Sequence, residues 1–227
     1  MIVFKNVSKV YPPHNVALER ATFEITQGEF VILVGRSGAG KTTILRLINR
    51  SDQPTQGKII YKNIEYERLR GKKLTELRRK ITTIFQDFKL LSERSVYDNV
   101  AIALELLGRS AREIRVKTEE ALKMVDLWHH GPILAKYLSG GEKQRLAIAR
   151  AIVMDPEVIL ADEPTGNLDP ISAKEVIDLL RQLHQQGKTV ILATHNRETV
   201  DLLKTRVMTL NGKRIARDET PGKYALI

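Results

Sequence analysis

A glycine-rich loop at residues 35–43 constrains the fold of this chain more than any other stretch. The loop reads Gly-Arg-Ser-Gly-Ala-Gly-Lys-Thr-Thr and joins an apolar run, residues 30–34, to a segment of helical character, residues 44–49. Its three glycines let the backbone curl so that successive N–H groups point at one anion, and the helix adds its positive N-terminal end. A strand, such a loop and a helix, in this order, predict a phosphate-binding loop.

The residues of this loop suggest separate roles. Lys41 is long enough to reach the β- and γ-phosphates of a nucleotide, and the Thr42 hydroxyl can ligate Mg²⁺. The alternative is an ordinary glycine-rich turn, but Gly-x4-Gly-Lys-Ser/Thr arises by chance in only about 1% of chains of this length. Nucleotide binding is therefore favoured. Contacts with the nucleotide are also expected from the rest of the loop: Gly35, Arg36, Ser37, Gly38, Ala39, Gly40 and Thr43.

The composition excludes several classes of protein. With 227 residues, of which 42% are hydrophobic, the chain can bury a substantial core. It has no cysteine, which excludes disulfides and favours a reducing compartment. Residues 1–11 lack the continuous apolar stretch of a secretory signal, and the longest apolar runs are far shorter than the roughly 20 residues that span a bilayer. We expect a soluble protein with neither a signal peptide nor a transmembrane segment.

Apolar stretches alternate with helical ones along most of the chain. Strand-like runs occur at residues 2–7, 21–25, 30–34, 58–61, 81–85, 158–161 and 189–193, with a hairpin at 206–216 around Asn211-Gly212. Helical spacing occurs at 95–107, 111–127, 142–154 and 171–185. This alternation predicts an α/β fold with a mostly parallel sheet covered on both faces. Residues 88–137 are predicted to be a helical insertion.

Basic residues are concentrated in two places. The net charge is +10, and the denser patch, residues 68–80, holds seven Lys and Arg residues against the single acid Glu76. A second patch lies near residues 204–217. A solvated face, an anionic membrane surface and nucleic acid are three explanations. Charge alone does not decide between them, although neither interleaved aromatic residues nor a nucleic-acid motif supports the third.

An acidic pair, Asp162-Glu163, follows the apolar run at residues 158–161. Asp162 would hold Mg²⁺ through its hydration shell, because Mg²⁺ prefers oxygen ligands and keeps several waters. Glu163 would then orient and polarise an attacking water. Acidic turns after strands are common, but this pair gains weight from the phosphate-binding loop that precedes it in the chain.

A second anion site is predicted at residues 138–145, Leu-Ser-Gly-Gly-Glu-Lys-Gln-Arg. The Ser139 hydroxyl and the two glycines open onto the N-terminus of the apolar helix at 142–154. A bare Ser-Gly-Gly would be an ordinary helix cap. The full octet is less ordinary, and one chain rarely needs two phosphate sites for one nucleotide.

Residues 35–43, 138–145 and 160–169 resemble, in order and spacing, the ATPase subunits of ATP-binding-cassette (ABC) transporters. The resemblance covers essentially the whole chain, and the octet matches that family's LSGGxxQR signature without departure. It implies a single domain at residues 1–227 with a P-loop NTPase core, an N-terminal antiparallel β subdomain and a helical subdomain inserted at about 88–137. It also implies that the protein binds ATP and Mg²⁺ and hydrolyses ATP to ADP and phosphate.

The resemblance assigns further residues to the site. Gln86 matches the glutamine that contacts Mg²⁺ or water and senses the γ-phosphate, so it would join Thr42 and Asp162 around the metal. His195 matches the switch histidine that hydrogen-bonds the γ-phosphate, and with Gln86 and Glu163 it completes the catalytic set. A satisfied histidine at a strand end is the alternative for His195.

The same resemblance implies that two copies close head to tail around two ATP molecules. Residues of the octet would contact the ATP of the opposite subunit, and a following loop would cross the dimer interface. Tyr11 matches the aromatic residue that stacks on adenine; the alternative is an aromatic that packs on its own loop. The octet residues are Ser139, Gly140, Gly141 and Glu142, and the loop residues are Asn167, Leu168 and Asp169.

Within the family, the chain resembles the FtsE-type cell-division ATPases more than nutrient importers. This resemblance rests on the short length and on residues 37–42, 85–91 and 95–100. It implies a peripheral place on the cytoplasmic face of the cell membrane, with the membrane protein FtsX as partner and the division-ring protein FtsZ as a second candidate. ATP-driven motion would activate cell-wall hydrolases. The partner groove would lie near residues 86–91, where Phe88, Leu90 and Leu91 are apolar.

Three alternatives remain open at this stage. Lipoprotein-release and macrolide-export ATPases share the segment at residues 161–169 and the same size. A nucleotide-gated scaffold would use ATP binding and dimer closure without depending on hydrolysis. A nucleic-acid-associated cassette would account for the basic charge, but such relatives usually carry two cassettes or long coiled coils.

Overall fold

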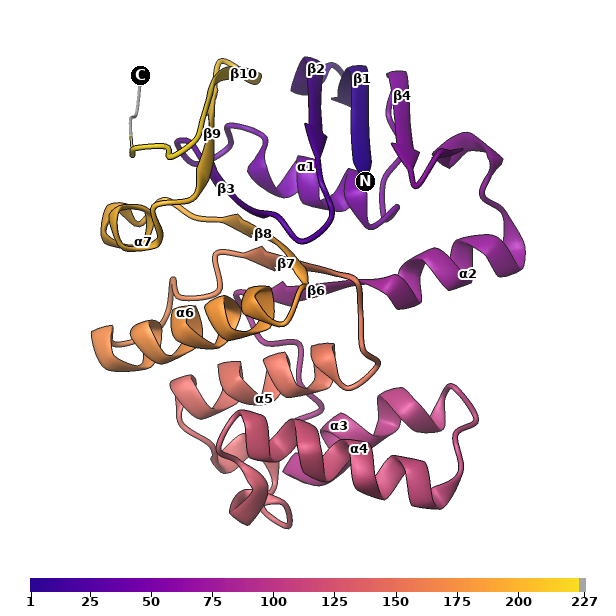
Figure 1. Cartoon of the computed structure of the whole chain (residues 1–227), viewed down its shortest axis with the longest axis vertical. Helices are drawn as coiled ribbons and strands as arrows, with labels where there is room; N and C mark the ends of the chain where they lie inside the picture. Colours follow the sequence, from indigo (N-terminus) through magenta and orange to yellow (C-terminus); the bar gives the residue numbers. More distant parts are fainter. Residues whose placement is uncertain (225–227) are drawn as a thin grey trace.

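The computed structural model describes residues 1–224, which form two sheets with helices packed between and beneath them (Figure 1). The first sheet is antiparallel, with the strand order β2-β1-β4-β5. Its strands are β1 (Ile2–Tyr11), β2 (Asn15–Ile25), β4 (Gln56–Tyr61) and β5 (Ile64–Glu65). The antiparallel N-terminal sheet implied by the family resemblance is therefore present.

The second sheet has six strands in the order β10-β9-β3-β8-β7-β6. Its strands are β3 (Phe30–Val34), β6 (Ile81–Phe85), β7 (Val158–Asp162), β8 (Thr189–Ala193), β9 (Arg206–Asn211) and β10 (Arg214–Glu219). All neighbours are parallel except β10, which pairs antiparallel with β9. Strands β3 and β8 are buried along their whole length, since both faces of the sheet are covered.

The helices divide between the two faces of the parallel sheet (Figure 1). They are α1 (Lys41–Ile48), α2 (Gly71–Lys80), α3 (Val96–Glu105), α4 (Ala111–Met124), α5 (Gly140–Ile152), α6 (Pro170–Gln185) and α7 (Arg197–Leu203). Alternate residues of β3 serve two cores: Val31 and Leu33 pack with α1 and the first sheet, whereas Ile32 and Val34 pack with α3 to α6. No helix among residues 1–224 is long and apolar enough to span a membrane.

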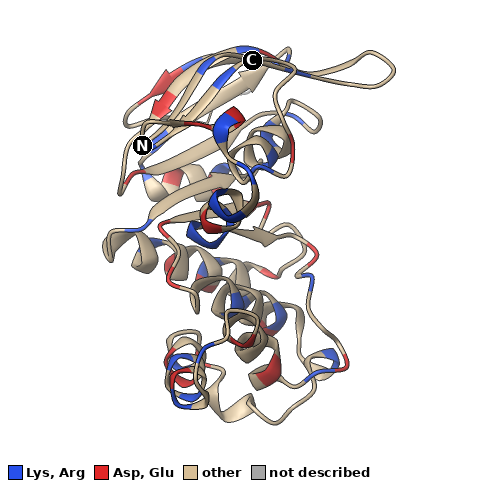
Figure 2. Cartoon of the chain, turned by 90° about the vertical axis from the view of Figure 1, so that its right-hand side faces the viewer, with Lys and Arg blue, Asp and Glu red and all other residues tan. Residues whose placement is uncertain are grey.

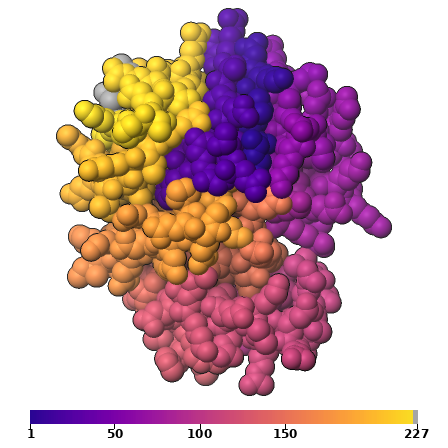
Figure 3. Space-filling model, in the orientation of Figure 1, coloured from indigo at the N-terminus to yellow at the C-terminus, as the bar shows by residue number. Residues whose placement is uncertain are grey.

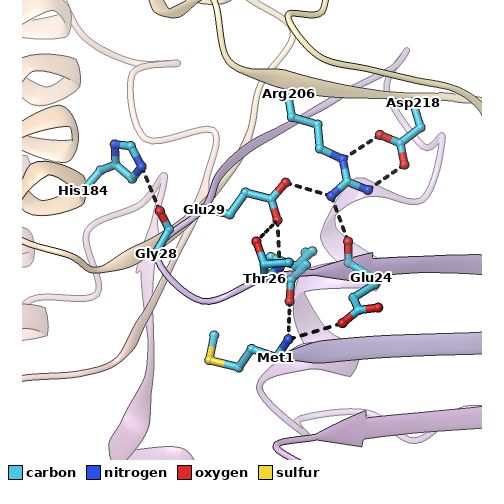
Figure 4. A network of polar contacts seen from close by, with 9 residues as sticks. Met1, Glu24, Thr26, Gly28, Glu29, His184, Arg206 and Asp218 are labelled. Carbon is cyan, nitrogen blue, oxygen red and sulfur yellow. Dashed lines mark hydrogen bonds and ion pairs between the residues drawn. The ribbon is translucent and has the colours of Figure 1, made fainter.

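Figure 3 shows the C-terminal residues (yellow) lying against the N-terminal ones (indigo). Polar contacts join the two sheets where they adjoin (Figure 4). The guanidinium of Arg206 donates to both carboxylate oxygens of Asp218 at 2.6 Å, to Glu29 Oε1 at 2.8 Å and to the Glu24 carbonyl at 2.8 Å. These bonds, led by those to Asp218, raise the pKa of Arg206 despite its burial, so it stays charged. Farther along, the Glu19 N–H donates to the Lys213 carbonyl at 2.8 Å.

Several predicted elements differ from those observed. The first two strands are longer than expected and form one hairpin. The prediction was too short because register shifts between residues 4 and 10 interrupt the alternation of apolar and polar residues that marks a strand. The helices expected at 95–107 and 111–127 are shorter, at α3 and α4, and α5 begins two residues before its predicted start. Helices α2 and α7 were not predicted. The sequence of α2 is mostly charged, with only Leu77 buried, so it carries little apolar periodicity.

Candidate nucleotide site

The loop between β3 and α1 has the geometry that an anion site requires. Its last residue before the helix, Gly40, caps α1 with φ 111°, and no side chain accepts a hydrogen bond from the first turn. A Cβ on Gly40 would lie 2.5 Å from the Ala17 carbonyl, so only glycine fits there. The N–H groups at the start of α1 are therefore free of side-chain caps and available to a phosphate.

Lys41 is held inside the loop that it was predicted to serve. Its side chain is buried, and its Nζ donates to the Gly35 carbonyl at 2.8 Å. The same Nζ lies 3.3 Å from Oε1 of Glu163, at the end of β7. The ammonium group thus has one backbone acceptor and one carboxylate partner, both at the place where phosphates are expected.

Thr42 and Asp162 meet across two elements that are far apart in the sequence. The Thr42 hydroxyl donates to Oδ1 of Asp162 at 3.1 Å, since α1 starts beside the carboxyl end of β7. Burial raises the pKa of the Asp162 carboxyl, and the hydrogen bond from Thr42 opposes that shift. One hydroxyl and one carboxylate in contact fit the oxygen donors that Mg²⁺ takes, with water completing its shell.

Glu163 and His195 also lie in direct contact. His195 follows β8, and its Nδ1 lies 2.9 Å from Oε2 of Glu163. The backbone N–H of His195 donates to the same oxygen at 3.3 Å. Glu163 has a left-handed backbone, with φ 47°, and its own N–H donates to the Ala193 carbonyl at 2.9 Å. A left-handed backbone is uncommon for a residue other than glycine. Glu163 lines the cavity at the carboxyl ends of the strands, together with the phosphate-binding loop and Gln86.

These side chains surround one cavity of about 690 Å³. Predicted site residues that line it are Gly35, Arg36, Ser37, Gly38, Lys41, Thr42, Gln86, Asp162, Glu163 and His195. The volume suits a ligand of nucleotide size. Residues from four separate parts of the sequence therefore converge at the carboxyl ends of parallel strands, where ligands bind in open α/β sheets.

Tyr11 borders a second hollow, of about 260 Å³, on the other side of the same loop. Ala39, Gly40 and Thr43 line this hollow too, and Gly38, Lys41 and Thr42 line both. The Tyr11 hydroxyl donates to Asp52 Oδ2 at 2.5 Å, and Lys9 Nζ lies 4.7 Å from its ring centroid. Burial and the bond to Asp52 raise the pKa of Tyr11. Stacking on adenine stays a prediction.

Gln86 connects the cavity to the loop after β7. Its Nε2 donates to Asn167 Oδ1 at 3.3 Å, and a Cβ on Gly166 would come within 2.8 Å of the same nitrogen. The glutamine therefore bridges the cavity wall and the loop that was expected at a dimer interface. Asp169 caps α6 by accepting from the N–H groups of Ile171 and Ser172, each at 3.0 Å.

The octet around Ser139 lies outside both hollows. Ser139 caps α5: its hydroxyl accepts from the Glu142 N–H at 3.3 Å, while Glu142 accepts from the Ser139 N–H at 2.8 Å. Hydrogen bonds from Ser139 lower the pKa of Glu142. Ser139 and Gly140 are exposed, and Gly140 faces Leu168 of the neighbouring loop. This second anion-type cap therefore contributes to neither of the two hollows that the phosphate-binding loop lines.

The structure adds two residues that sequence reasoning missed. Lys213, in the β9–β10 turn, donates to the Gly38 carbonyl and lines the hollow beside Tyr11. Tyr224 follows β10 and lines the main cavity near His195. No local pattern marks either residue, because each reaches the loop across more than 170 positions of sequence.

An apolar groove of about 320 Å³ lies between β6, α3 and α5. Phe88 lines it, as predicted, together with Phe85, Ile102 and Leu106. The other two predicted residues do not line it. Leu90 packs against the core and Leu91 is exposed outside the groove, since the chain turns away after Phe88, whose φ is 60°.

Comparison with known proteins adds a family and several close relatives. The family described as ABC transporter matches residues 18–166. The cell division ATP-binding protein FtsE of Bacillus subtilis (strain 168) is 44% identical over 224 residues, covering 99% of this chain and 98% of that protein. FtsE of Mycobacterium tuberculosis is 43% identical, covering 100% and 99%. FtsE of Escherichia coli (strain K12) is 43% identical, covering 93% and 95%.

Solved structures share the fold over nearly the whole chain. The ATP-binding cassette MJ0796, in a dimeric post-hydrolysis state bound to ADP and Pi, is 35% identical with a TM-score of 0.88. The alignment covers 99% of this chain and 100% of that one. The cassette cbiO1 of Clostridium perfringens, part of the ABC transporter complex cbiONQ, is 32% identical with a TM-score of 0.88, covering 97% and 88%.

Proposed function

This chain belongs to the ABC transporter family and is an ATP-binding, ATP-hydrolysing subunit, and from that premise we propose that it drives a membrane complex in cell division. The identity of 43–44% to FtsE proteins, over nearly the full length of both chains, carries this proposal. Those relatives are named as cell division ATP-binding proteins. The proposal is supported by the cavity at the carboxyl ends of the strands, because the residues proposed to act in hydrolysis line it.

In the proposed site, Lys41 leaves Glu163 for the β- and γ-phosphates of ATP. Glu163 is then free to orient the attacking water and polarise it, and His195 donates to the γ-phosphate. Thr42, Gln86 and Asp162 would hold Mg²⁺, which neutralises charge on the phosphate oxygens. This arrangement is supported by the contacts of Lys41 and His195 with the carboxylate of Glu163. All three residues line the same cavity.

The complete site is proposed to form between two copies of the chain. Ser139, Gly140, Gly141 and Glu142 would close over the ATP held by the partner's phosphate-binding loop, with Asn167, Leu168 and Asp169 crossing the interface. Two observations support this: the octet lines neither hollow of its own chain, and MJ0796 was solved as a dimer. Hydrolysis removes the phosphate that joins the two halves, so they separate.

The proposed partner is the membrane protein FtsX, docked in the apolar groove between β6, α3 and α5. Leu106 is 80% exposed at this groove, which suits a site that is covered in a complex. The chain would then lie peripherally on the cytoplasmic face of the membrane, and its opening and closing would activate cell-wall hydrolases through FtsX. FtsZ is proposed as a second partner at the division ring.

Co-purification from membranes tests the partner. The intact chain should recover FtsX, and Leu106→Glu should abolish recovery because it places a charge in the groove. Leu202→Glu is the matched control, since Leu202 is 48% exposed on α7, outside the groove. Recovery of a lipoprotein-release or macrolide-export permease in place of FtsX would refute the cell-division assignment and leave the ATPase assignment intact.

A further inference from the structure

Helix α2 presents a basic face that the proposed ATPase site does not use. Leu77 is buried and Leu74 half-buried, and these two residues attach the helix to the body of the protein. The remaining positions of α2 are exposed. We call the cations of this face and its N-terminal approach the α2 basic face: Arg68, Arg70, Lys72, Lys73, Arg78, Arg79 and Lys80.

Few of these cations are neutralised within the protein. Two form ion pairs, Arg68 with Glu65 at 3.4 Å and Lys80 with Glu157 at 3.2 Å. Within residues 1–224, no carboxylate lies within 4.0 Å of a charged nitrogen of the other five: Arg70, Lys72, Lys73, Arg78 and Arg79. Since protein surfaces usually intersperse both signs, this local excess needs a mobile counterion or an anionic partner.

A buried arginine adds to the excess. Arg50, just after α1, is 5% exposed; its Nη2 donates to the Tyr66 carbonyl at 3.3 Å, and its Nε has no partner in the described chain. Arg78 donates to the Arg50 carbonyl at 3.1 Å. Burial lowers the pKa of Arg50, and the nearby charges of Arg70 and Arg78 lower it further. The charge of Glu67 opposes these shifts. None of the three arginines forms an ion pair within 4.0 Å in the described chain, so an anion at this position would offset their charge.

The position of α2 indicates where such an anion would come from. The helix runs directly into β6, and Thr82 to Phe85 of that strand line the apolar groove. Figure 2 views the side of the molecule on which α2 lies in Figure 1. The inference rests on the proposed function at this point: if the groove receives a membrane protein, the adjoining α2 basic face lies close to the bilayer.

We infer that the α2 basic face binds the headgroups of anionic phospholipids. Lipid phosphates accept hydrogen bonds from Arg and Lys, and each basic residue near an anionic surface strengthens binding by on the order of fivefold. Nucleic acid is disfavoured because α2 carries no aromatic side chain on which a base could stack. Contact with lipid would hold the ATPase at the membrane and orient its groove toward the partner.

Vesicle flotation of the full chain, without any membrane partner, tests the inference. Vesicles of phosphatidylcholine with 30% phosphatidylglycerol should carry the chain at low salt and release it at 0.5 M NaCl, where screening is strong. Pure phosphatidylcholine vesicles should not. The triple variant Lys72→Glu, Lys73→Glu, Arg79→Glu should bind anionic vesicles at least tenfold more weakly.

A matched control separates the face from net charge. The variant Arg112→Glu, Arg115→Glu, Lys174→Glu makes the same charge change at exposed positions of α4 and α6, and it should bind as the unchanged chain does. The inference would be overturned if both variants bound anionic vesicles equally weakly. It would also be overturned if the unchanged chain bound neutral and anionic vesicles equally well, or bound neither. The inference would also be overturned if the chain bound duplex DNA and the α2 variant lost that binding while its vesicle binding stayed the same. ATPase activity should be unchanged in both variants, so failure here leaves the proposed function standing.

Discussion

Lys41 Nζ lies 3.3 Å from Glu163 Oε1. The residue expected to bind phosphate and the residue expected to activate water are therefore partners of each other. Lys41 retains the Gly35 carbonyl as a second acceptor, and Glu163 retains His195. When ATP binds, its phosphate oxygens would replace Glu163 as the partner of Lys41. The Glu163 carboxylate would therefore be released only when the substrate is bound.

Glu163→Gln should separate ATP binding from hydrolysis. The amide keeps the shape of the side chain but cannot act as a base, so turnover should fall by at least about 100-fold. ATP affinity should hold or improve, because the competing ion pair to Lys41 is lost. Size-exclusion chromatography with ATP should then show an accumulated dimer, and Glu198→Gln, at an exposed position of α7, serves as the control. A variant that supports division normally would favour the nucleotide-gated scaffold.

Lys41→Ala and Ser139→Arg should fail at different steps. The first removes the cation at the phosphates and should abolish ATP binding to the monomer. The second places a bulky cation on the exposed cap of α5, outside the cavity, and should leave monomer binding largely intact while blocking dimer formation and hydrolysis. Nucleotide binding and phosphate release measured on both variants distinguish these outcomes. Normal hydrolysis by Ser139→Arg would contradict the shared site.

The two glycines of the octet should differ in their effect on stability. A Cβ on Gly141 would lie 2.4 Å from Ser172 Oγ and 2.7 Å from Ser172 Cβ, whereas a Cβ on Gly140 would lie 3.6 Å from Leu168 Cδ2. Gly141→Ala should therefore destabilise folding by about 1–3 kcal/mol, and Gly140→Ala should not. Thermal unfolding measures both changes. Ser172→Gly removes the atoms that the new Cβ would meet. The double variant Gly141→Ala, Ser172→Gly should therefore lose less free energy of unfolding than the sum of the losses in the two single variants.

Glu157 should make stability depend on pH in the acid range. Burial alone would raise its pKa, but hydrogen bonds from Lys62, Tyr61 and Lys80 outweigh burial and lower the pKa from 4.5 to about 2. Because the folded pKa lies below the unfolded one, the contribution is fully present above about pH 5 and is lost as pH falls toward 2.

Glu157→Gln should thus lower the free energy of unfolding by on the order of 2–3 kcal/mol at pH 7. The difference from the unchanged chain should shrink in urea denaturation at pH 3.5. Glu120→Gln, at an exposed position of α4, should show no comparable dependence. A difference that is constant from pH 7 to pH 3.5 would mean that the three hydrogen bonds do not control the charge of Glu157.

Much of the fold followed from local pattern. The fully buried strands at residues 30–34 and 189–193 have the predicted bounds, because largely apolar runs of that length suit a sheet covered on both faces. Helix α2 was missed for the opposite reason: it is attached through Leu74 and Leu77 and is otherwise charged. The groove residues Leu90 and Leu91 were misplaced, since the left-handed turn at Phe88 has no signal in side-chain type.

The phosphate-binding loop could be predicted from the chain's residues alone, because its glycines, lysine and threonine are contiguous and the backbone conformation that they need is local. The helix that follows the octet was also predicted, although α5 begins two residues before the predicted start. Only the tertiary structure decided that Lys41 pairs with Glu163, that Gln86 reaches Asn167, and that Lys213 and Tyr224 border the site. The strand order β9-β3-β8-β7-β6 interleaves distant segments, so these contacts depend on packing of the whole chain, which no short pattern encodes.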